Sequence, residues 1–349
     1  MKATNQTRRS LLKTATGLIL APALPLAARN ALAQEANVVV GTWGGDYQNL
    51  LQKIVNPLAG EMNVVFDTGN AVARATKVRA EKTARRGTVE VALLQDVDMY
   101  DVSRADVFEP LTAKEVPNLV NTFEQFRTPY SAPHIFSAMV LVYNTEKIKT
   151  APDSFTAALD PALKGRTGFS DILFVANTLF AGLANGGNMS SFEAGKKFLG
   201  ELRKNDPKVF PSNEAVAAAL KSGEIWMTCM WKARALQWQD AGLPLGFVVP
   251  REGAVAVTFE GAVPRNARNK AGAYRYLNAM LDPKGQVEFA RAMGYAPTVR
   301  NAEMPPDLAA RVSFTAEEMA RVKPYDSPAL ADLKNDCLDY WNKSFKASN

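Results

Sequence analysis

The chain has 349 residues, with 41 Lys and Arg against 35 Asp and Glu, and a formal net charge of +6 at pH 7. Hydrophobic residues make up 47% of it, so it is long and apolar enough to form two lobes that each bury a core. Only two cysteines are present, which excludes a small disulfide scaffold.

The first 33 residues predict a removable export signal. Basic residues up to the pair Arg8 and Arg9 precede a weakly apolar run over 18–28, and Ala31-Leu32-Ala33 supplies a small-residue cleavage site. The paired arginines indicate the twin-arginine subtype. The apolar run is shorter than the roughly 20 residues that span a bilayer. We therefore expect 1–33 to be a twin-arginine signal peptide, with export by the twin-arginine machinery, no stable membrane insertion and a periplasmic location.

Cleavage after Ala33 changes the charge balance. It removes five of the 41 basic residues and no acidic residue, so 36 basic residues remain against 35 acidic ones. The remaining charges of both signs are interspersed along the chain. A nucleic-acid-binding protein needs a concentrated basic stripe that neutralises phosphates, so this class is excluded.

Predicted strands and helices alternate along most of the mature chain. The β-rich run 37–41 comes before a glycine-bearing turn, and apolar residues at helical spacing predict a helix over 46–58. The next predicted elements are a strand over 62–66, a helix over 71–84, strands over 89–94, 139–143 and 167–169, helices over 174–183 and 214–221, and strands over 225–230 and 245–249. This alternation predicts two α/β lobes.

Helices dominate the last third of the chain. Earlier in the chain, Ser190 and Glu193 predict a capping box for the helix that follows the 184–189 loop. Further helices are predicted over 271–281, 284–293, 315–322 and 329–345.

The side chains that enzymes use for catalysis are scarce. His134 is the only histidine, and neither Cys229 nor Cys337 lies in a recognisable nucleophile motif. The chain has no P-loop motif, no dinucleotide fingerprint and no closely spaced zinc ligands. We therefore expect no cofactor, no metal and no enzyme activity, and we expect His134 to pack or to form a hydrogen bond.

The turn after the first predicted strand is a candidate binding element. Trp43, Gly44 and Gly45 stand between a strand end and a helix start, which is where ligands bind in open α/β sheets. Free backbone N–H groups at such a turn favour an anionic group. The alternative is a tight turn in which the tryptophan only packs.

Seven short segments carry a family resemblance in their order along the chain. They are TWGG (42–45), VYNTEKI (142–148), LKGR (163–166), SGEI (222–225), FVVPREG (247–253), VPRNA (263–267) and GYAPT (294–298). Together they resemble the periplasmic solute-binding proteins of ABC importers, in the branch that contains the spermidine/putrescine-binding proteins.

This resemblance implies the α/β fold of a type II periplasmic binding protein. One lobe would consist of residues 35–140 and 258–310, and the other of 141–257 and 311–349. Crossover strands would join the lobes, and the ligand cleft between them would close on a small solute. The resemblance also implies a monomer that delivers its solute to inner-membrane ABC permease subunits.

The same resemblance implies ligand contacts at strand ends in both lobes. Simpler roles remain open, because Asn70 and Asp96 can cap helices and Asp171 can serve its turn. The implied ligand-binding residues are Trp43, Gly44, Gly45, Asn70 and Gln95 or Asp96 in the first lobe, Ser170, Asp171, Trp231 and Lys232 in the second, and Glu260.

Two departures from the family pattern bear on the ligand. Polyamine binders commonly carry an acid shortly after a tryptophan, whereas Lys232 follows Trp231 here, and a second family aspartate falls on Phe259, next to Glu260. Because a buried dication needs carboxylates to replace its hydration, these departures favour a solute that bears a carboxylate or another anion, zwitterions included. Basic residues that could hold it, if they are not merely solvated, are Arg74, Lys232 and Arg234.

Three alternatives remain open. The first is binding of a polyamine, spermidine or putrescine, for uptake. The second is a periplasmic enzyme on the same scaffold, because a fold does not determine a function. The third is a sensor subunit that reports the solute to a membrane receptor.

Overall fold

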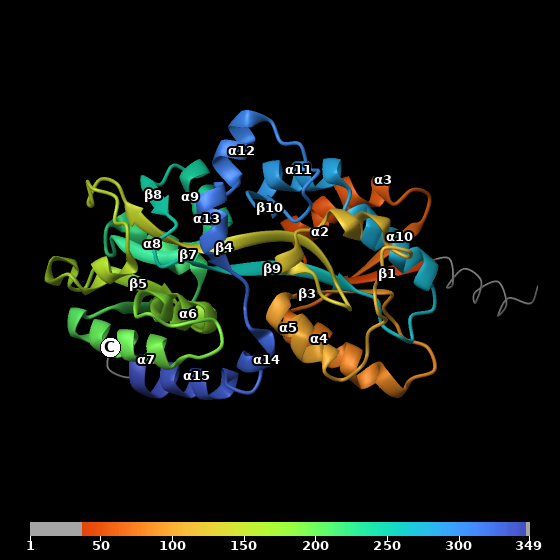
Figure 1. Ribbon diagram of the computed structural model, residues 1–349, viewed down its shortest axis with the longest axis horizontal. Coiled ribbons are helices and arrows are strands. Elements are labelled where there is room, and N and C mark those ends of the chain that lie inside the picture. Colours follow the sequence, from red (N-terminus) through yellow and green to blue (C-terminus); the bar gives the residue numbers. More distant parts are fainter. Residues whose placement is uncertain (1–36, 347–349) are drawn as a thin grey trace, which may run out of the picture. The chain divides into compact units, whose positions relative to one another are not determined.

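The computed structural model describes residues 37–346, so the predicted signal peptide 1–33 lies outside the described residues. The strands form one mixed sheet in the order β2-β1-β3-β9-β4-β7-β5-β6, and β8 and β10 pair with β4 while β11 pairs with β9. Figure 1 shows β4 and β9 running through the middle of the sheet, with helices on both of its faces.

The first lobe is built on three parallel strands, β1 (Asn37–Thr42), β2 (Asn63–Thr68) and β3 (Val91–Gln95). Residues of β3 alternate between its two faces. Val91 and Leu93 pack in one core, and Ala92 and Leu94 pack in another. The core around Val91 and Leu93 is covered by α2 (Asp46–Leu50), η1 (Leu51–Val55), α3 (Asn56–Leu58), α10 (Lys270–Met280) and α11 (Pro283–Met293). The core around Ala92 and Leu94 is covered by α4 (Ala71–Ala80), η2 (Glu81–Thr83) and α5 (Asp96–Ser103).

The second lobe is built on β5 (Thr167–Ser170), which pairs in parallel with β6 (Lys208–Phe210) and β7 (Met227–Trp231). Its core is the largest apolar cluster of the described chain and includes many aromatic side chains. The surrounding elements are α6 (Phe174–Ala184), α7 (Glu193–Leu202), η8 (Arg203–Asn205), α8 (Asn213–Ser222), α9 (Lys232–Asp240), β8 (Leu245–Val248), α15 (Lys334–Tyr340) and η9 (Trp341–Phe345).

Two long antiparallel strands connect the lobes, β4 (Ala132–Asn144) and β9 (Ala254–Ala262). The first part of β4 pairs with β9, and its last part pairs with β7 and β8. Since β9 also pairs with β3, one continuous sheet passes from lobe to lobe. The predicted two-lobed α/β fold is confirmed, whereas the residue boundaries of the lobes stay a prediction.

The remaining elements lie in connections and in the C-terminal segment. Thr315 and Glu318 form a complete capping box at α13 (Ala316–Arg321). The capping box predicted at Ser190 and Glu193 is wrong, because α7 starts at Glu193 and its N-cap, Phe192, offers no side-chain acceptor. The remaining elements, in the connections and in the C-terminal segment, are η3 (Pro117–Asn121), η4 (Glu124–Phe126), η5 (Phe155–Leu159), η6 (Pro161–Leu163), η7 (Asp171–Leu173), β10 (Ala296–Pro297), α12 (Pro306–Val312), α13 (Ala316–Arg321), β11 (Val322–Lys323) and α14 (Ser327–Leu330).

No helix between residues 37 and 346 is long and apolar enough to cross a membrane.

Candidate ligand cleft

Strand ends from both lobes meet around one small pocket, which we call the cleft pocket. β3 ends where α5 begins, β5 ends just before η7 and α6, and β7 ends where α9 begins. The pocket has a volume of about 180 Å³. Its lining residues are Gln95, Asp96, Val97, Asp98, Ile172, Leu173, Phe174, Val175, Ala176, Trp231, Val257, Tyr325 and Lys334.

Asp96 is the carboxylate at the centre of this arrangement. Its Oδ1 accepts a hydrogen bond from the backbone N–H of Val97 at 2.9 Å, and its Oδ2 accepts one from Thr258 at 3.1 Å. Burial raises the pKa of Asp96 well above its usual range, and the nearby Glu260 carboxylate raises it further. The backbone therefore holds Asp96 in place, and a positive charge beside it would be favourable.

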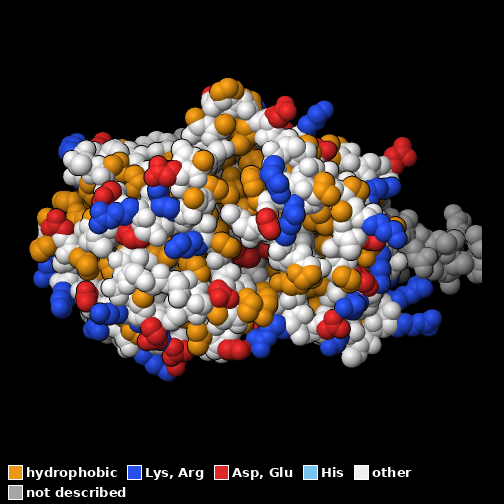
Figure 2. Space-filling view, viewed as in Figure 1, with side chains coloured by type: hydrophobic (Ala, Val, Ile, Leu, Met, Phe, Trp, Pro, Cys, Tyr) orange, Lys and Arg blue, Asp and Glu red, His pale blue; other side chains and the backbone are white. Residues whose placement is uncertain are grey.

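A second pocket of about 410 Å³, which we call the side pocket, shares Asp96 and Tyr325 with the cleft pocket. Glu260 lines it and is only 4% exposed, and its carboxylate accepts a hydrogen bond from Ser131 Oγ at 2.5 Å. Burial raises the pKa of Glu260 to about 7. Figure 2 shows a hollow near the centre of this face with acidic side-chain atoms at its bottom.

Aromatic and charged side chains complete the cleft pocket. Trp231 is 7% exposed and forms part of its wall. Burial raises the pKa of Tyr325 far above its usual value, and Asp96 and Asp98 raise it further. Lys334 Nζ lies 3.6 Å from the Asp98 carboxylate, so the basic lining residue of the pocket already has an acidic partner.

The turn after β1 packs against the first lobe. The Trp43 ring lies 4.0 Å from the Arg74 guanidinium and 5.1 Å from the Phe259 ring. Gly45 has φ +68°, a conformation that favours glycine. Gly44 lines a different pocket of about 610 Å³, together with Arg234 and Tyr295.

The side chains of two further predicted residues form hydrogen bonds within the protein. Asn70 Oδ1 caps α4 by accepting from the Ala73 N–H at 2.8 Å. The Asp171 carboxylate accepts from Trp341 Nε1 at 2.7 Å and from Lys346 Nζ at 2.8 Å. Although burial raises the pKa of Asp171, these hydrogen bonds lower it below the usual value.

The other two predicted residues, Ser170 and Lys232, are buried. Ser170 Oγ has no hydrogen-bond partner among the described residues. Lys232 Nζ donates to the Ser313 carbonyl at 2.5 Å and lies 4.6 Å from the Phe314 ring centre. Burial lowers the pKa of Lys232 to about 8. Its ammonium therefore points to the α12–α13 connection instead of the cleft pocket.

The structure thus brings Asp96 and Trp231 together in one pocket and adds residues that sequence reasoning missed. Gln95, which the resemblance offered beside Asp96, lines the pocket too, whereas Asp98 was missed although it lies only two residues from Asp96. Tyr325 and Lys334 come from the C-terminal segment, more than 220 positions away in sequence, and no local pattern marks them.

The side chains considered for catalysis are buried. Tyr47 OH and His134 Nδ1 are 2.8 Å apart, and burial lowers the pKa of His134 to about 3, so the ring is neutral. Cys229 and Cys337 are separate buried thiols. Within residues 37–346 no group of three or more His, Cys, Asp or Glu could hold a metal ion.

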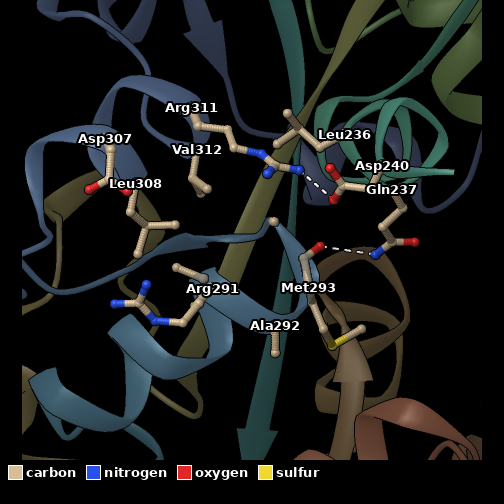
Figure 3. A pocket seen from close by; sticks show the side chains of 12 residues that line it. Leu236, Gln237, Asp240, Arg291, Ala292, Met293, Asp307, Leu308, Arg311 and Val312 are labelled. Atoms are coloured by element: carbon tan, nitrogen blue, oxygen red, sulfur yellow. Dashed lines mark hydrogen bonds and ion pairs between the residues drawn. The ribbon is translucent and has the colours of Figure 1, made fainter. Parts of the chain in front are cut away.

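Helix α9 also contacts the first lobe and α12 around a pocket of about 160 Å³ that is separate from the cleft pocket (Figure 3). Gln237 Nε2 donates to the Met293 carbonyl at 2.9 Å, and Arg311 forms an ion pair with Asp240. These contacts connect α9 to α11 and α12.

Two α/β lobes with a pocket at the strand ends between them define a type II periplasmic binding protein. Residues 59–316 match the family described as bacterial extracellular solute-binding protein, and because this match covers more than half of the chain, the chain belongs to that family. It is a solute-binding protein and not an enzyme. The family is extracellular and the curated relatives below are periplasmic, which places the chain in the periplasm.

Several curated relatives are named for polyamines. The spermidine/putrescine-binding periplasmic protein of Escherichia coli K12 is 29% identical over 206 residues, which cover 58% of this chain and 56% of the relative. The putrescine/cadaverine-binding protein of Pseudomonas aeruginosa is 24% identical over 195 residues, which cover 47% and 51%. The chain therefore spans about half the length of the curated relatives it matches.

Solved structures share the fold over almost their whole length. An ABC transporter structure from Clostridium perfringens has a TM-score of 0.77 and 20% identity, and the match covers 88% of this chain and 100% of that one. A structure named the Atu4243-GABA receptor has a TM-score of 0.76 and 19% identity, with 88% and 96% covered.

Proposed function

We propose that this chain is the substrate-binding component of an ABC importer. It captures a small organic solute in the cleft pocket and, as a monomer, delivers it to inner-membrane permease subunits after export by the twin-arginine machinery. The family, the two lobes and the pocket between them support this proposal. Closure follows when the solute binds the closed arrangement of the lobes more tightly than the open one.

The solute that fits the cleft pocket carries an ammonium group. The observation that carries this proposal is the partly buried Asp96 carboxylate, which accepts hydrogen bonds from two backbone N–H groups and lines the same pocket as Trp231. A buried carboxylate is costly unless a cation pairs with it, and an indole face attracts a cation as well. The names of the curated relatives, which refer to spermidine, putrescine and cadaverine, agree with such a solute.

The basic side chains that favoured an anion from the sequence lie elsewhere. Lys232 bonds to the Ser313 carbonyl, and Arg74 stacks on Trp43 and donates to the Leu93 carbonyl at 3.0 Å. Among the described residues that line the cleft pocket, Lys334 alone is basic. A zwitterionic solute would place its ammonium group at Asp96, and its carboxylate would compete with Asp98 for Lys334.

Calorimetric titration of the purified protein tests this proposal with four solutes: putrescine, spermidine, γ-aminobutyrate and butyrate. We expect binding of an amine and none of butyrate. The Asp96→Asn variant should lose at least about tenfold in affinity, because a charge-assisted contact contributes roughly 1.5–3 kcal/mol. Asp101→Asn is the matched control on the same helix, because Asp101 is exposed and pairs with Arg79.

Two outcomes would contradict the proposed solute class: binding of butyrate without binding of any amine, or full affinity of Asp96→Asn. A diamine response without a γ-aminobutyrate response would favour a polyamine, and the reverse would favour a zwitterion.

A further inference from the structure

The side pocket lies between the first lobe and the C-terminal segment. Its walls come from α5, from residues 125–130 that lead into β4, from β9 and from residues between 324 and 328 at the start of α14. Figure 1 shows α14 beside α5 below the crossing strands β4 and β9, and an ion pair between Arg104 and Asp332, at 2.9 Å, joins the end of α5 to the segment after α14. The turn after β1, helix α9 and the segment after α11 contribute none of the described lining residues.

The side pocket reaches β9 from one face of the strand. Thr258 and Glu260 line it, whereas Val257 lines the cleft pocket and Phe259 packs in the apolar clusters of both lobes. Because successive residues of a strand point to opposite faces, the side chain of Glu260 points away from the Phe259 ring.

Glu260 presents an unused hydrogen-bond acceptor to this pocket. Its side chain is only 4% exposed, and its Oε2 accepts from Ser131 Oγ at 2.5 Å. Its Oε1 accepts no hydrogen bond from a described residue and is not fully enclosed by protein, so it is open to the pocket that Glu260 lines. An unpaired carboxylate oxygen on so buried a side chain favours an occupant that donates a hydrogen bond and carries a positive charge.

The other charges around the side pocket also favour a cation. Asp96 adds a second carboxylate, and Arg127 is the one basic residue of the described lining. The Arg127 guanidinium is used elsewhere, because it donates to Thr122 Oγ1 at 3.1 Å and to the carbonyls of Val120 and Thr122 at 3.0 and 2.9 Å. A calcium ion takes about six to eight oxygen ligands, which two carboxylates do not supply, so an organic cation is the better match.

Aromatic and proline side chains form most of the remaining wall. Ring faces attract a cation, and the carbon surface of the rings and prolines suits an apolar body. The side pocket also has room for such a body, with about 410 Å³ against about 180 Å³ in the cleft pocket. These wall residues are Tyr100, Phe126, Pro129, Tyr130, Pro324 and Tyr325.

We propose that the side pocket is a second binding site, for a primary ammonium ion with an apolar body, such as an arylalkylamine. The ammonium group donates to Glu260 Oε1 and lies against the tyrosine rings, and the apolar body packs on the prolines. This site goes beyond the proposed function, which uses Asp96 and Trp231 in the cleft pocket and gives Glu260 no role.

Calorimetric titration of the purified protein tests the site with phenethylamine and with its neutral analogue 2-phenylethanol, at pH 8, above the pKa of about 7 of Glu260. We expect phenethylamine to bind and 2-phenylethanol to bind at least about tenfold more weakly. Glu260→Gln keeps an acceptor for Ser131 and should weaken phenethylamine binding by about tenfold or more, through loss of a charge-assisted contact. Tyr130→Leu should weaken it by about fivefold, through loss of an aromatic face.

Two control variants should keep the phenethylamine affinity of the wild-type protein. Glu201→Gln changes an exposed glutamate on α7, and Trp231→Ala changes a wall of the cleft pocket that does not line the side pocket.

Absence of phenethylamine binding up to tens of millimolar, or equal binding of 2-phenylethanol, would overturn the proposal. Full phenethylamine affinity in Glu260→Gln would also overturn it, and so would loss of binding in Trp231→Ala, which would assign the amine to the cleft pocket. Absence of putrescine and γ-aminobutyrate binding would contradict the proposed solute of the cleft pocket and would leave the phenethylamine result unchanged, so the two proposals fail separately.

Discussion

Glu260 offers a direct test of the electrostatics at the edge of the cleft. Its pKa of about 7, against an ordinary value of 4.5, means that burial penalises the charged carboxylate in the folded protein. A shift of about 2.5 pKa units corresponds to about 3 kcal/mol. The penalty is absent below pH 4.5, where the group is protonated in both states, grows between pH 4.5 and 7, and is complete above pH 7.

Glu260→Gln removes the charge and keeps an acceptor for the Ser131 hydroxyl. Above pH 7 the ligand-free variant should therefore be more stable than the wild-type protein, by up to about 3 kcal/mol. Below pH 4.5 this difference should vanish. Urea unfolding at pH 8 and at pH 4.5 measures the two free energies of unfolding.

The control for this experiment is Glu201→Gln, an exposed glutamate on α7, which should change the stability by less than about 0.5 kcal/mol at either pH. Equal effects of Glu260→Gln at the two pH values would refute the reasoning, because they would show that the carboxylate is not destabilised by its burial.

Four further substitutions test the cleft, the packing and the backbone of the turn after β1. Trp231→Ala should weaken solute binding by about tenfold in calorimetry, through loss of an aromatic wall, while thermal unfolding shows that the protein still folds. Gly195→Ala should destabilise the protein by more than about 3 kcal/mol in urea unfolding, because its Cβ would lie 1.9 Å from the Thr178 carbonyl oxygen where α7 packs on α6. Gly45→Ala should cost about 2 kcal/mol because φ is +68° there, whereas its neighbour Gly44→Ala, with open space and no such φ, should cost less than about 0.5 kcal/mol in the same assay.

Periodicity predicted the elements that obey one simple pattern. The strands β1, β3, β5 and β7 and the helices α6, α8, α10 and α11 lie within a few residues of their predicted positions, because each has either a continuous apolar run or one apolar face. Strand β9 was missed because the lobes cover different faces of it. Val257 packs in the second lobe's core, while the adjacent Thr258 and Glu260 carry polar groups to the cleft.

The long strand β4 shows the same limit. Its second half, 139–143, was predicted, whereas its first half, which contains Pro133, His134 and Ser137, was not predicted as a strand. Pairing with β9 buries the segment nonetheless, and the register shift between Pro133 and Ile135 accommodates the proline. Tertiary pairing, rather than local propensity, makes these residues a strand.

The solute charge that the cleft favours could not be predicted from the sequence. The reason is geometric, and the residues from Trp231 to Arg234 illustrate it. Successive residues of a helix point about 100° apart, so neighbouring side chains serve different surroundings. Trp231 ends strand β7 and lines the cleft pocket, whereas in α9 Lys232 bonds to Ser313 and Arg234 lines a separate pocket with Gly44 and Tyr47. The two cations that follow the tryptophan in the sequence are therefore not cations of the cleft, and the acids around Asp96 determine which solute charge that pocket favours.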